Sequence, residues 1–191
     1  MIWNNHLNDV PEGAHAFLGA SKYSWLNYDE EKLVSTYKNY LQAQIMGTRL
    51  HALACEHILL GIKMPKSKTT LNMYVNDAIG FRMQPEQPLY YSQNCYGTAD
   101  AISFKEKDSF LRIHDLKTGV TPASMRQLEI YTALFCLEYG KQPEKIDVEL
   151  RIYQNDEVWV SNPKPDDILP IMDKIIEFDK LIEDVKTEQW G

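Results

Sequence analysis

Cysteine is scarce in this chain, and its spacing excludes two kinds of site. The three cysteines, Cys55, Cys95 and Cys136, lie far apart and form no Cys-x-x-Cys pair. An iron–sulfur cluster needs four clustered thiolates, and a disulfide framework needs paired cysteines in an oxidising compartment. We therefore expect no iron–sulfur cluster, cysteines that are simply buried, and a cytoplasmic location.

Long hydrophobic runs are also missing. No run of eighteen apolar residues occurs, and the first residues, Met1 to Asn5, lack the charged-then-apolar pattern of a signal peptide. We expect no membrane partner. Internal repeats, linkers and low-complexity segments are absent as well, and 44% of the 191 residues are hydrophobic. This composition predicts a single domain over residues 1–191 with one core.

Positive charge is in deficit, which argues against a nucleic-acid-binding monomer. The chain has 20 Lys and Arg against 27 Asp and Glu, a formal net charge of −7. Affinity for a polyanion comes largely from neutralisation of phosphates by Lys and Arg. Part of the deficit is local, because acidic residues concentrate in residues 166–188, whereas Lys63, Lys66 and Lys68 cluster near the middle. A basic strip, a bound metal, a homo-oligomer or a partner protein would supply the missing charge.

The most informative segment that is present, residues 97–119, contains two aspartates and a lysine in a predicted hairpin. Residues 96–104 and 109–116 have strand composition and are joined by a polar turn. Asp115 and Lys117 share the parity of the preceding apolar residues Leu111 and Ile113, so the pair continues a buried row. A buried acid is costly unless it is compensated, and a bound metal would compensate it.

Asp100, Asp115 and Lys117 together have the composition of a metal-dependent nuclease site. Two carboxylates at the ends of adjacent strands can hold a hard divalent cation through oxygen. A lysine two residues after the second carboxylate points to the same face of the sheet and meets the developing phosphate charge. The alternative is that Asp115 and Lys117 form an exposed ion pair, since Asp-x-Lys is common by chance.

A helix is predicted downstream of the hairpin. Thr121 followed by Pro122 is typical of a helix start, and apolar residues then recur at helical spacing. Gln127 and Tyr131 are four residues apart and share one face of this helix. The recurring apolar residues are Leu128, Tyr131, Leu134 and Phe135.

Two residues compete for the role of a metal ligand on an upstream helix. His51 and Glu56 are five residues apart, so on a helix they diverge by about 140° and cannot both face one metal. Gly47 opens the face on which His51 lies, which favours His51; a core histidine packed beside Cys55 is the alternative. We expect His57 and His114 to face solvent or to lie behind the ligands, because His114 has the wrong strand parity to join Asp115.

Taken in order, these motifs resemble the PD-(D/E)XK nuclease superfamily. The matching patterns are Gly47-x-x-x-His51, Gly97-x-x-Asp100, Asp115-x-Lys117 and Gln127-x-x-x-Tyr131. The similarity is greatest to the RecB-like branch, which includes CRISPR-associated exonucleases and phage exonucleases of the lambda (YqaJ-like) type, and it spans roughly residues 15–140. The resemblance implies a DNA exonuclease of recombination, repair or phage DNA metabolism, in a bacterium or a phage-infected host.

The resemblance also implies roles for individual residues. His51, Asp100, Asp115 and the Leu116 carbonyl would bind Mg²⁺ or Mn²⁺, and Lys117 would act on the water or the phosphate. Gln127 and Tyr131 would support the site or contact DNA. Candidates for substrate binding are Ser21, Thr98 and Arg126. Lambda-type enzymes often have glutamate where His51 stands, and RecB relatives often carry the four-cysteine cluster that is missing here.

Residues 17–25 are similar to the Ala-Ser segment that opens a helix near the DNA end in lambda-type exonucleases. Ser21 would present its hydroxyl and a helix amide to phosphate, or it is simply a helix N-cap. An arginine that some relatives place seven residues earlier is absent, because Ala14 stands there. Two other functions stay open: a catalytically silent DNA-binding or regulatory protein on the same fold, and an endonuclease on the same core.

The pattern along the chain predicts an α/β (α+β) fold in which a helix is followed by three strands, a helix and a strand. This order is the restriction-endonuclease-like αβββαβ core of the superfamily: a central mixed sheet flanked by helices, with extra helices at both ends. The expected helices are 20–28, 29–61 as one or two helices, 68–81, 122–139 and 166–186; the expected strands are 83–91 at an edge, the hairpin 96–116, 145–154 and 158–161 after a turn at 155–157.

Overall fold

A mixed five-stranded sheet organises the computed structural model, which describes residues 1–4, 6, 16–40, 49–118 and 123–190. The strands follow one another across the sheet in the order β1-β2-β3-β4-β5, and only β3 and β4 are parallel. A parallel pair needs a crossover connection, and helix α4 provides it. The strands are β1 (Gln84–Ser92), β2 (Cys95–Lys105), β3 (Phe110–Leu116), β4 (Asp147–Gln154) and β5 (Glu157–Ser161).

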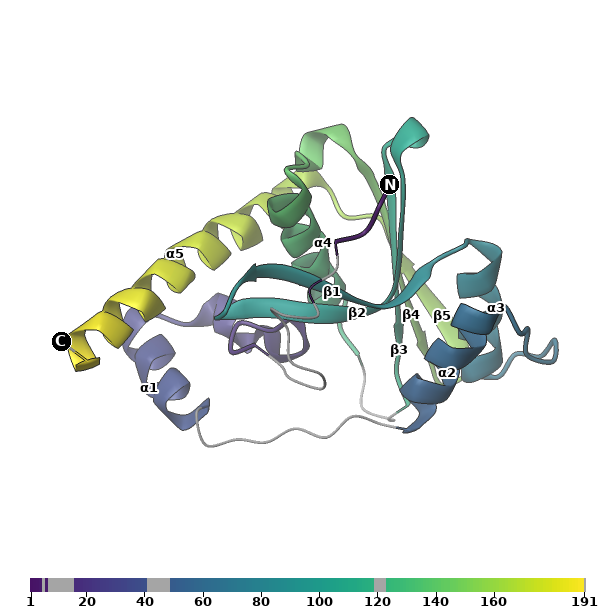
Figure 1. Ribbon diagram of the computed structural model, residues 1–191, viewed down its shortest axis with the longest axis horizontal. Coiled ribbons are helices and arrows are strands. Elements are labelled where there is room, and N and C mark those ends of the chain that lie inside the picture. Colours follow the sequence, from purple (N-terminus) through teal and green to yellow (C-terminus); the bar gives the residue numbers. More distant parts are fainter. Residues whose placement is uncertain (5, 7–15, 41–48, 119–122, 191) are drawn as a thin grey trace.

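Helices cover the sheet from two sides. Figure 1 shows α2 and α3 on one side of β3, β4 and β5, and α4 with the long α5 on the other. The described helices are η1 (Ala20–Asn27), α1 (Glu30–Tyr40), α2 (Arg49–Leu60), α3 (Thr70–Gly80), α4 (Arg126–Tyr139) and α5 (Pro165–Trp190), with short 3₁₀ turns η2 (Glu106–Asp108) and η3 (Pro143–Lys145).

The alternation of side chains along β3 separates two apolar clusters. Leu111 and Ile113 are fully buried in the larger cluster, which α4 and α5 complete. Leu116 packs in the smaller cluster with Ala54 of α2 and Tyr74 of α3. Successive residues of a strand point to opposite faces, so both faces of β3 are buried. The end of β3, where Asp115 lies, is therefore enclosed between two packed layers.

The predicted order of elements is confirmed, with shifted boundaries. The segment 20–28 forms a 3₁₀ helix, and the segment 68–81 forms a helix only over Thr70–Gly80. The predicted helix 29–61 appears as α1 and α2, and Gly47 lies outside the described residues. The predicted helix 122–139 is described from Arg126, while Thr121 and Pro122 also lie outside the described residues. Helix α4 ends at Tyr139, and Gly140 follows as the C-cap with a left-handed φ of 61°.

The C-terminal half differs from the prediction at three boundaries. The strand expected from residue 145 begins at Asp147, because Pro143 starts a 3₁₀ turn that uses Lys145. The turn before β5 is confined to Asn155 and Asp156, both with positive φ. The last helix runs from Pro165 to Trp190, longer than the expected 166–186. Within the described residues, every helix is too short or too polar to cross a membrane.

Candidate metal centre

Asp100 and Asp115 lie close together on neighbouring strands, because the charge of Asp100 acts on the carboxyl of Asp115. The β2–β3 ladder ends at the pair Ala101–His114, and the next residue along each strand is one of these two aspartates. The side chain of Asp115 is 1% exposed and continues the buried row of Leu111 and Ile113. The predicted burial of this acid is therefore confirmed. Two carboxylates are held side by side at the end of the hairpin.

Lys117 only partly compensates the buried carboxylate of Asp115. Its ammonium donates a 3.0 Å hydrogen bond to Oδ1 of Asp115. The other oxygen, Oδ2, also lies 3.0 Å from the ammonium but accepts no hydrogen bond, although it is buried. Burial and the neighbouring Asp100 raise the pKa of Asp115, while Lys117 lowers it. A buried carboxylate oxygen without a hydrogen bond is a position that a cation satisfies.

Asp100 connects the end of β3 to helix α2. Its Oδ2 accepts a 2.7 Å hydrogen bond from the backbone amide of Leu116, and its Oδ1 lies 3.5 Å from Nδ1 of His51. The hydrogen bond with Asp100 raises the pKa of His51, and the partial burial of the ring opposes this. The Leu116 peptide is thus fixed beside both carboxylates. This arrangement brings together all four predicted metal-binding residues.

The structure separates the two candidates on α2. His51 is half-buried and turned toward Asp100, whereas Glu56 is exposed on another face of the helix. Their divergence follows from the five-residue separation on a helix. Of these two residues, only His51 is therefore placed to bind the same cation as the two aspartates.

Lys117 also contacts the helix that follows the hairpin. Its ammonium donates a 2.7 Å hydrogen bond to Oε1 of Gln127, and the amide of Gln127 donates a 3.2 Å hydrogen bond to the hydroxyl of Tyr131. Burial and the nearby carboxylates hold the pKa of Tyr131 well above its ordinary value, so this phenol stays protonated. A Cβ at Gly97 would lie 2.9 Å from the Tyr131 ring, which explains why glycine precedes Asp100 by three residues.

Glu86 is a site residue that sequence reasoning missed. His51, Glu86 and Asp100 each present a ligand atom, and these atoms lie within 4.8 Å of one another. The β1–β2 register pairs Pro85 with Ala101 and Gln87 with Ala99, so Glu86 stands opposite Asp100. Withdrawal of its carboxylate from water and the charge of Asp100 raise the pKa of Glu86 to about 7. Finding Glu86 required the pairing of β1 with β2, which the sequence does not indicate.

The donors present fit a hard divalent cation. Carboxylates and a backbone carbonyl are the ligands that Mg²⁺ and Mn²⁺ prefer, and an imidazole is also acceptable to Mn²⁺. His51, Asp100 and Asp115 supply the side-chain donors of this set, and the Leu116 carbonyl is the remaining predicted ligand. Oδ2 of Asp115, which accepts no hydrogen bond and has the Lys117 ammonium 3.0 Å away, is the feature most readily satisfied by a further cation.

Other predicted residues have no hydrogen bond or ion pair with the two aspartates. Arg126 is half exposed and pairs with Glu129 at 2.7 Å. Thr98 is partly exposed on β2, and Ser21 is exposed on η1. The residue before Ser21, Ala20, has its backbone nitrogen 3.8 Å from where a Cβ on Gly97 would lie. None of these three residues has a hydrogen bond or ion pair with either aspartate among the interactions of the described residues.

The position of His114 differs from the expectation that this histidine faces solvent. It is on the opposite face from Asp115, as its parity predicts, but it is fully buried and does not face solvent. Its Nδ1 lies 3.3 Å from the hydroxyl of Tyr153, and its ring packs edge-on against Phe81. Burial and two nearby arginines hold the pKa of His114 well below its ordinary value. Helix α3 covers this face, so the ring is part of the packing under that helix. His57 is partly exposed and lies 3.0 Å from the Ile62 carbonyl.

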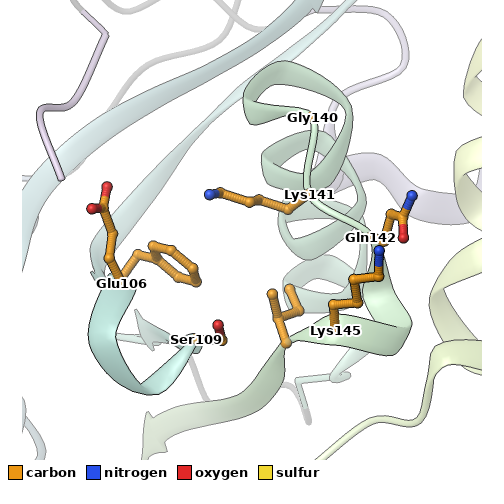
Figure 2. A pocket seen from close by; sticks show the side chains of 8 residues that line it. Glu106, Ser109, Gly140, Lys141, Gln142 and Lys145 are labelled. Carbon is orange, nitrogen blue, oxygen red and sulfur yellow. The ribbon is translucent and has the colours of Figure 1, made fainter.

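A well-formed hollow elsewhere contains none of the candidate residues. It has a volume of about 430 Å³ and lies where turn η2 meets the end of α4. Figure 2 shows Lys141 extended across it, with Glu106 and Lys145 at the rim. The Lys141 ammonium lies 5.2 Å from the centre of the Phe104 ring. Its charged lining residues are Glu106, Lys141 and Lys145. The candidate metal centre lies at the other end of the hairpin.

Comparisons with known proteins identify no family. No family model and no curated protein matches the chain. Among solved structures, the crystal structure of SSO0001 resembles it with 11% sequence identity and a TM-score of 0.34, over 79% of this chain and 85% of that one. A TM-score this low establishes neither a fold relationship nor a function.

Proposed function

We propose that this protein is a Mg²⁺- or Mn²⁺-dependent DNA exonuclease that acts in recombination, repair or phage DNA metabolism. It would act in the cytoplasm of a bacterium or of a phage-infected host. The observation that carries the proposal is the buried carboxylate of Asp115, which faces Asp100, contacts Lys117 and leaves one oxygen without a hydrogen bond. A protein that needed only stability would gain from an apolar residue at this position.

Each residue of the site has a distinct role. Asp100, Asp115, His51 and the Leu116 carbonyl would hold the cation, which lowers the pKa of water and neutralises charge on the phosphate. Lys117, fixed by Gln127, orients the nucleophile or stabilises the developing phosphate charge. Tyr131 holds the Gln127 amide in the orientation that leaves its oxygen facing Lys117.

DNA binding would need more than one acidic chain. A net charge of −7 opposes binding of several phosphates, so a homo-oligomer or a recombination partner protein would contribute positive charge. Ser21, Thr98 and Arg126 would contact the strand near its end. Binding through phosphates weakens steeply with salt, and that dependence would be a signature of this mode.

Purified protein incubated with end-labelled linear duplex and with covalently closed circles tests the proposal. We expect shortening of linear DNA from its ends only when Mg²⁺ or Mn²⁺ is present, and no loss of closed circles. Asp115→Asn should abolish both Mn²⁺ binding and cleavage, whereas Lys117→Ala should abolish cleavage and retain most binding. Light scattering on the same sample gives the mass of the active species.

Two outcomes would change the assignment. Rapid cutting of closed circles by a monomer would identify an endonuclease on this core. The acidic charge favours one other function, that of a catalytically silent DNA-binding or regulatory protein. Binding of DNA without cleavage at any concentration of Mg²⁺ or Mn²⁺ would establish that function instead.

A further inference from the structure

The two edges of the sheet are protected to different degrees. An unpaired edge strand offers its backbone groups to any other strand, and proteins block such edges with proline, charge or an irregular backbone. Strand β1, at one edge, contains Pro85 and Pro88, and between them Glu86 has a positive φ of 46°. The edge formed by β1 is therefore blocked against a further strand.

The edge formed by β5 has none of these features at its centre. Its pairing with β4 runs without a register shift from Glu157 to Ser161, and the strand contains no proline and, after Glu157, no charged residue. Its central side chains are apolar and open to solvent, since Trp159 is 41% exposed and Val160 is 53% exposed. Among the residues that the structure describes, no strand and no backbone hydrogen bond lies on the outer side of β5. An apolar, regular and unprotected edge is a surface on which another strand pairs.

The β4–β5 turn determines which backbone groups of β5 point outward. Residues 155–156 both have positive φ and form a two-residue turn, and the residues that flank such a turn, here Gln154 and Glu157, form a hydrogen-bonded pair. Hydrogen-bonded and non-hydrogen-bonded pairs alternate along an antiparallel ladder, so every second residue of β5, starting with Glu157, bonds to β4. The N–H and C=O groups of Val158 and Val160 therefore point away from β4.

We propose that β5 pairs antiparallel with β5 of a second copy of this chain, with Trp159 on the two-fold axis, so that the two sheets become continuous. In this register Val158 lies opposite Val160 of the partner subunit, and the outward backbone groups of both residues are paired across the axis. A shift by one residue would oppose outward groups to groups already bonded to β4. A shift by two would place only one of the two valines opposite an outward residue of β5.

The side chains also suit this pairing in a chain of net charge −7. Glu157 would lie opposite Ser161 of the partner subunit, so no two acids oppose each other along the edge. Valine faces valine on one face of the sheet and Trp159 faces its own counterpart on the other, and β-branched and aromatic cross-strand pairs are favourable. A strand of a different protein would have to match this order of residues, whereas a second copy matches it by symmetry.

The dimer should be reversible. A stable interface of standard size takes about 20–30 residues from each partner, far more than this short strand, so we expect a dimer that forms at high protein concentration and dissociates on dilution. Strand β4 separates β5 from the strands of the candidate metal centre, so pairing along this edge does not involve the residues of that centre. The dimer is one form of the homo-oligomer invoked for DNA binding, but it depends neither on metal nor on nuclease activity.

Sedimentation velocity of the full-length protein over a wide range of concentration tests the proposal. We expect the mass to rise from one chain to two. Val160→Pro removes an outward N–H without breaking a bond to β4 and should raise the dissociation constant of the dimer at least tenfold. Val160→Lys places a charge beside the axis and should have the same effect. Ile176→Lys, the same change of charge at a residue of α5 that is 46% exposed, is the control and should leave the dissociation constant unchanged.

Cysteine substitutions test the register. The background is Cys55→Ser, which removes a partly exposed thiol and leaves two buried ones. Trp159→Cys should form a disulfide-linked dimer under mild oxidation, because residues that face each other in a non-hydrogen-bonded pair have Cα atoms about 4.5 Å apart. Val160→Cys should not, since it faces residue 158 of the partner subunit and lies too far from its own counterpart.

Three results would overturn the inference. A monomer at every concentration overturns the dimer and leaves the edge to a strand of a different protein. A dimer that neither Val160→Pro nor Val160→Lys weakens forms through another surface. Cross-linking through residue 160 and not through residue 159 places the axis elsewhere. None of these results bears on the nuclease proposal, which metal binding and cleavage decide.

Discussion

The ammonium of Lys117 lies 2.7 Å from the amide oxygen of Gln127, a residue ten positions later on α4. This hydrogen bond fixes the lysine between Gln127 and Asp115. We predict that Gln127→Leu lowers cleavage roughly 10–100-fold, as loss of a supporting hydrogen bond commonly does, because the lysine loses its orientation. Mn²⁺ affinity should change little, since Gln127 is not a ligand.

Single-turnover cleavage and calorimetry on the same preparation separate the two effects. Gln127→Glu is the matched variant, because a carboxylate restores an acceptor for the ammonium and should retain more activity than leucine. Equal activity in Gln127→Leu and wild type would remove Gln127 from the site.

The helix ligand gives a second prediction. His51→Ala should weaken Mn²⁺ binding and cleavage at least tenfold, because Nδ1 of His51 lies 3.5 Å from Asp100. Glu56→Ala should leave both nearly unchanged, since Glu56 is exposed on another face of α2. The comparison uses Mn²⁺ titration and initial rates; the reverse ranking would assign the ligand role to Glu56.

Mn²⁺ affinity should depend on pH in a defined direction. The pKa of Glu86 is raised to about 7 from 4.5, and the pKa of His51 is also raised, so both groups hold protons that a cation must displace. Affinity should therefore rise with pH through this window and level off above neutral pH. Calorimetry at several pH values in buffers of different ionisation enthalpy would also report proton release. A flat profile between pH 5 and about 8 would contradict the assignment of both ligands.

The raised pKa values of Glu86 and His51 also contribute to the pH dependence of the stability of the metal-free protein. Because these folded-state pKa values are raised, protonation of Glu86 and His51 favours the folded state at low pH, and that contribution disappears as pH rises through the folded values.

Asp115→Asn should stabilise the metal-free protein although it abolishes function. The wild-type carboxylate is buried and faces Asp100, so its charge opposes folding, whereas asparagine is neutral and similar in size. We expect a gain of roughly 1–2 kcal/mol, about 2–8 °C in Tm for a chain of this size. Differential scanning calorimetry with chelator measures it at pH 8. Added Mn²⁺ should reverse the ranking, because only wild type gains binding energy.

Gly97 should be sensitive to the smallest substitution. A Cβ there would lie 2.9 Å from the Tyr131 ring, so Gly97→Ala must displace a buried side chain that bonds to Gln127. We expect a loss of roughly 1–3 kcal/mol in unfolding free energy and reduced cleavage. Gly80→Ala is the control, since nothing lies within 4 Å of its added carbon. Chemical denaturation of both variants gives the comparison, and equal stabilities would show that the ring moves aside freely.

Much of the fold followed from local patterns. The alternation of Leu111, Ile113 and Asp115 predicted a buried acid, and the four-residue spacing of Gln127 and Tyr131 placed both on one helix face; both relationships are present. Boundaries were less well determined, because turn geometry at Pro143 and Thr70 depends on contacts with other segments. Burial of His114 also escaped the sequence, since parity gives the face of a strand but not the helix that covers it.

The sequence by itself determined which residues near the hairpin belong to the candidate site, because strand parity and helical periodicity act over only a few residues. Only the tertiary structure decided which residues from other segments lie beside Asp100. His51 reaches Asp100 because α2 packs beside the hairpin, and Glu86 faces Asp100 because the β1–β2 register aligns residues fourteen positions apart. Register and helix packing are long-range relationships, and no local pattern in the chain encodes the distance between those side chains.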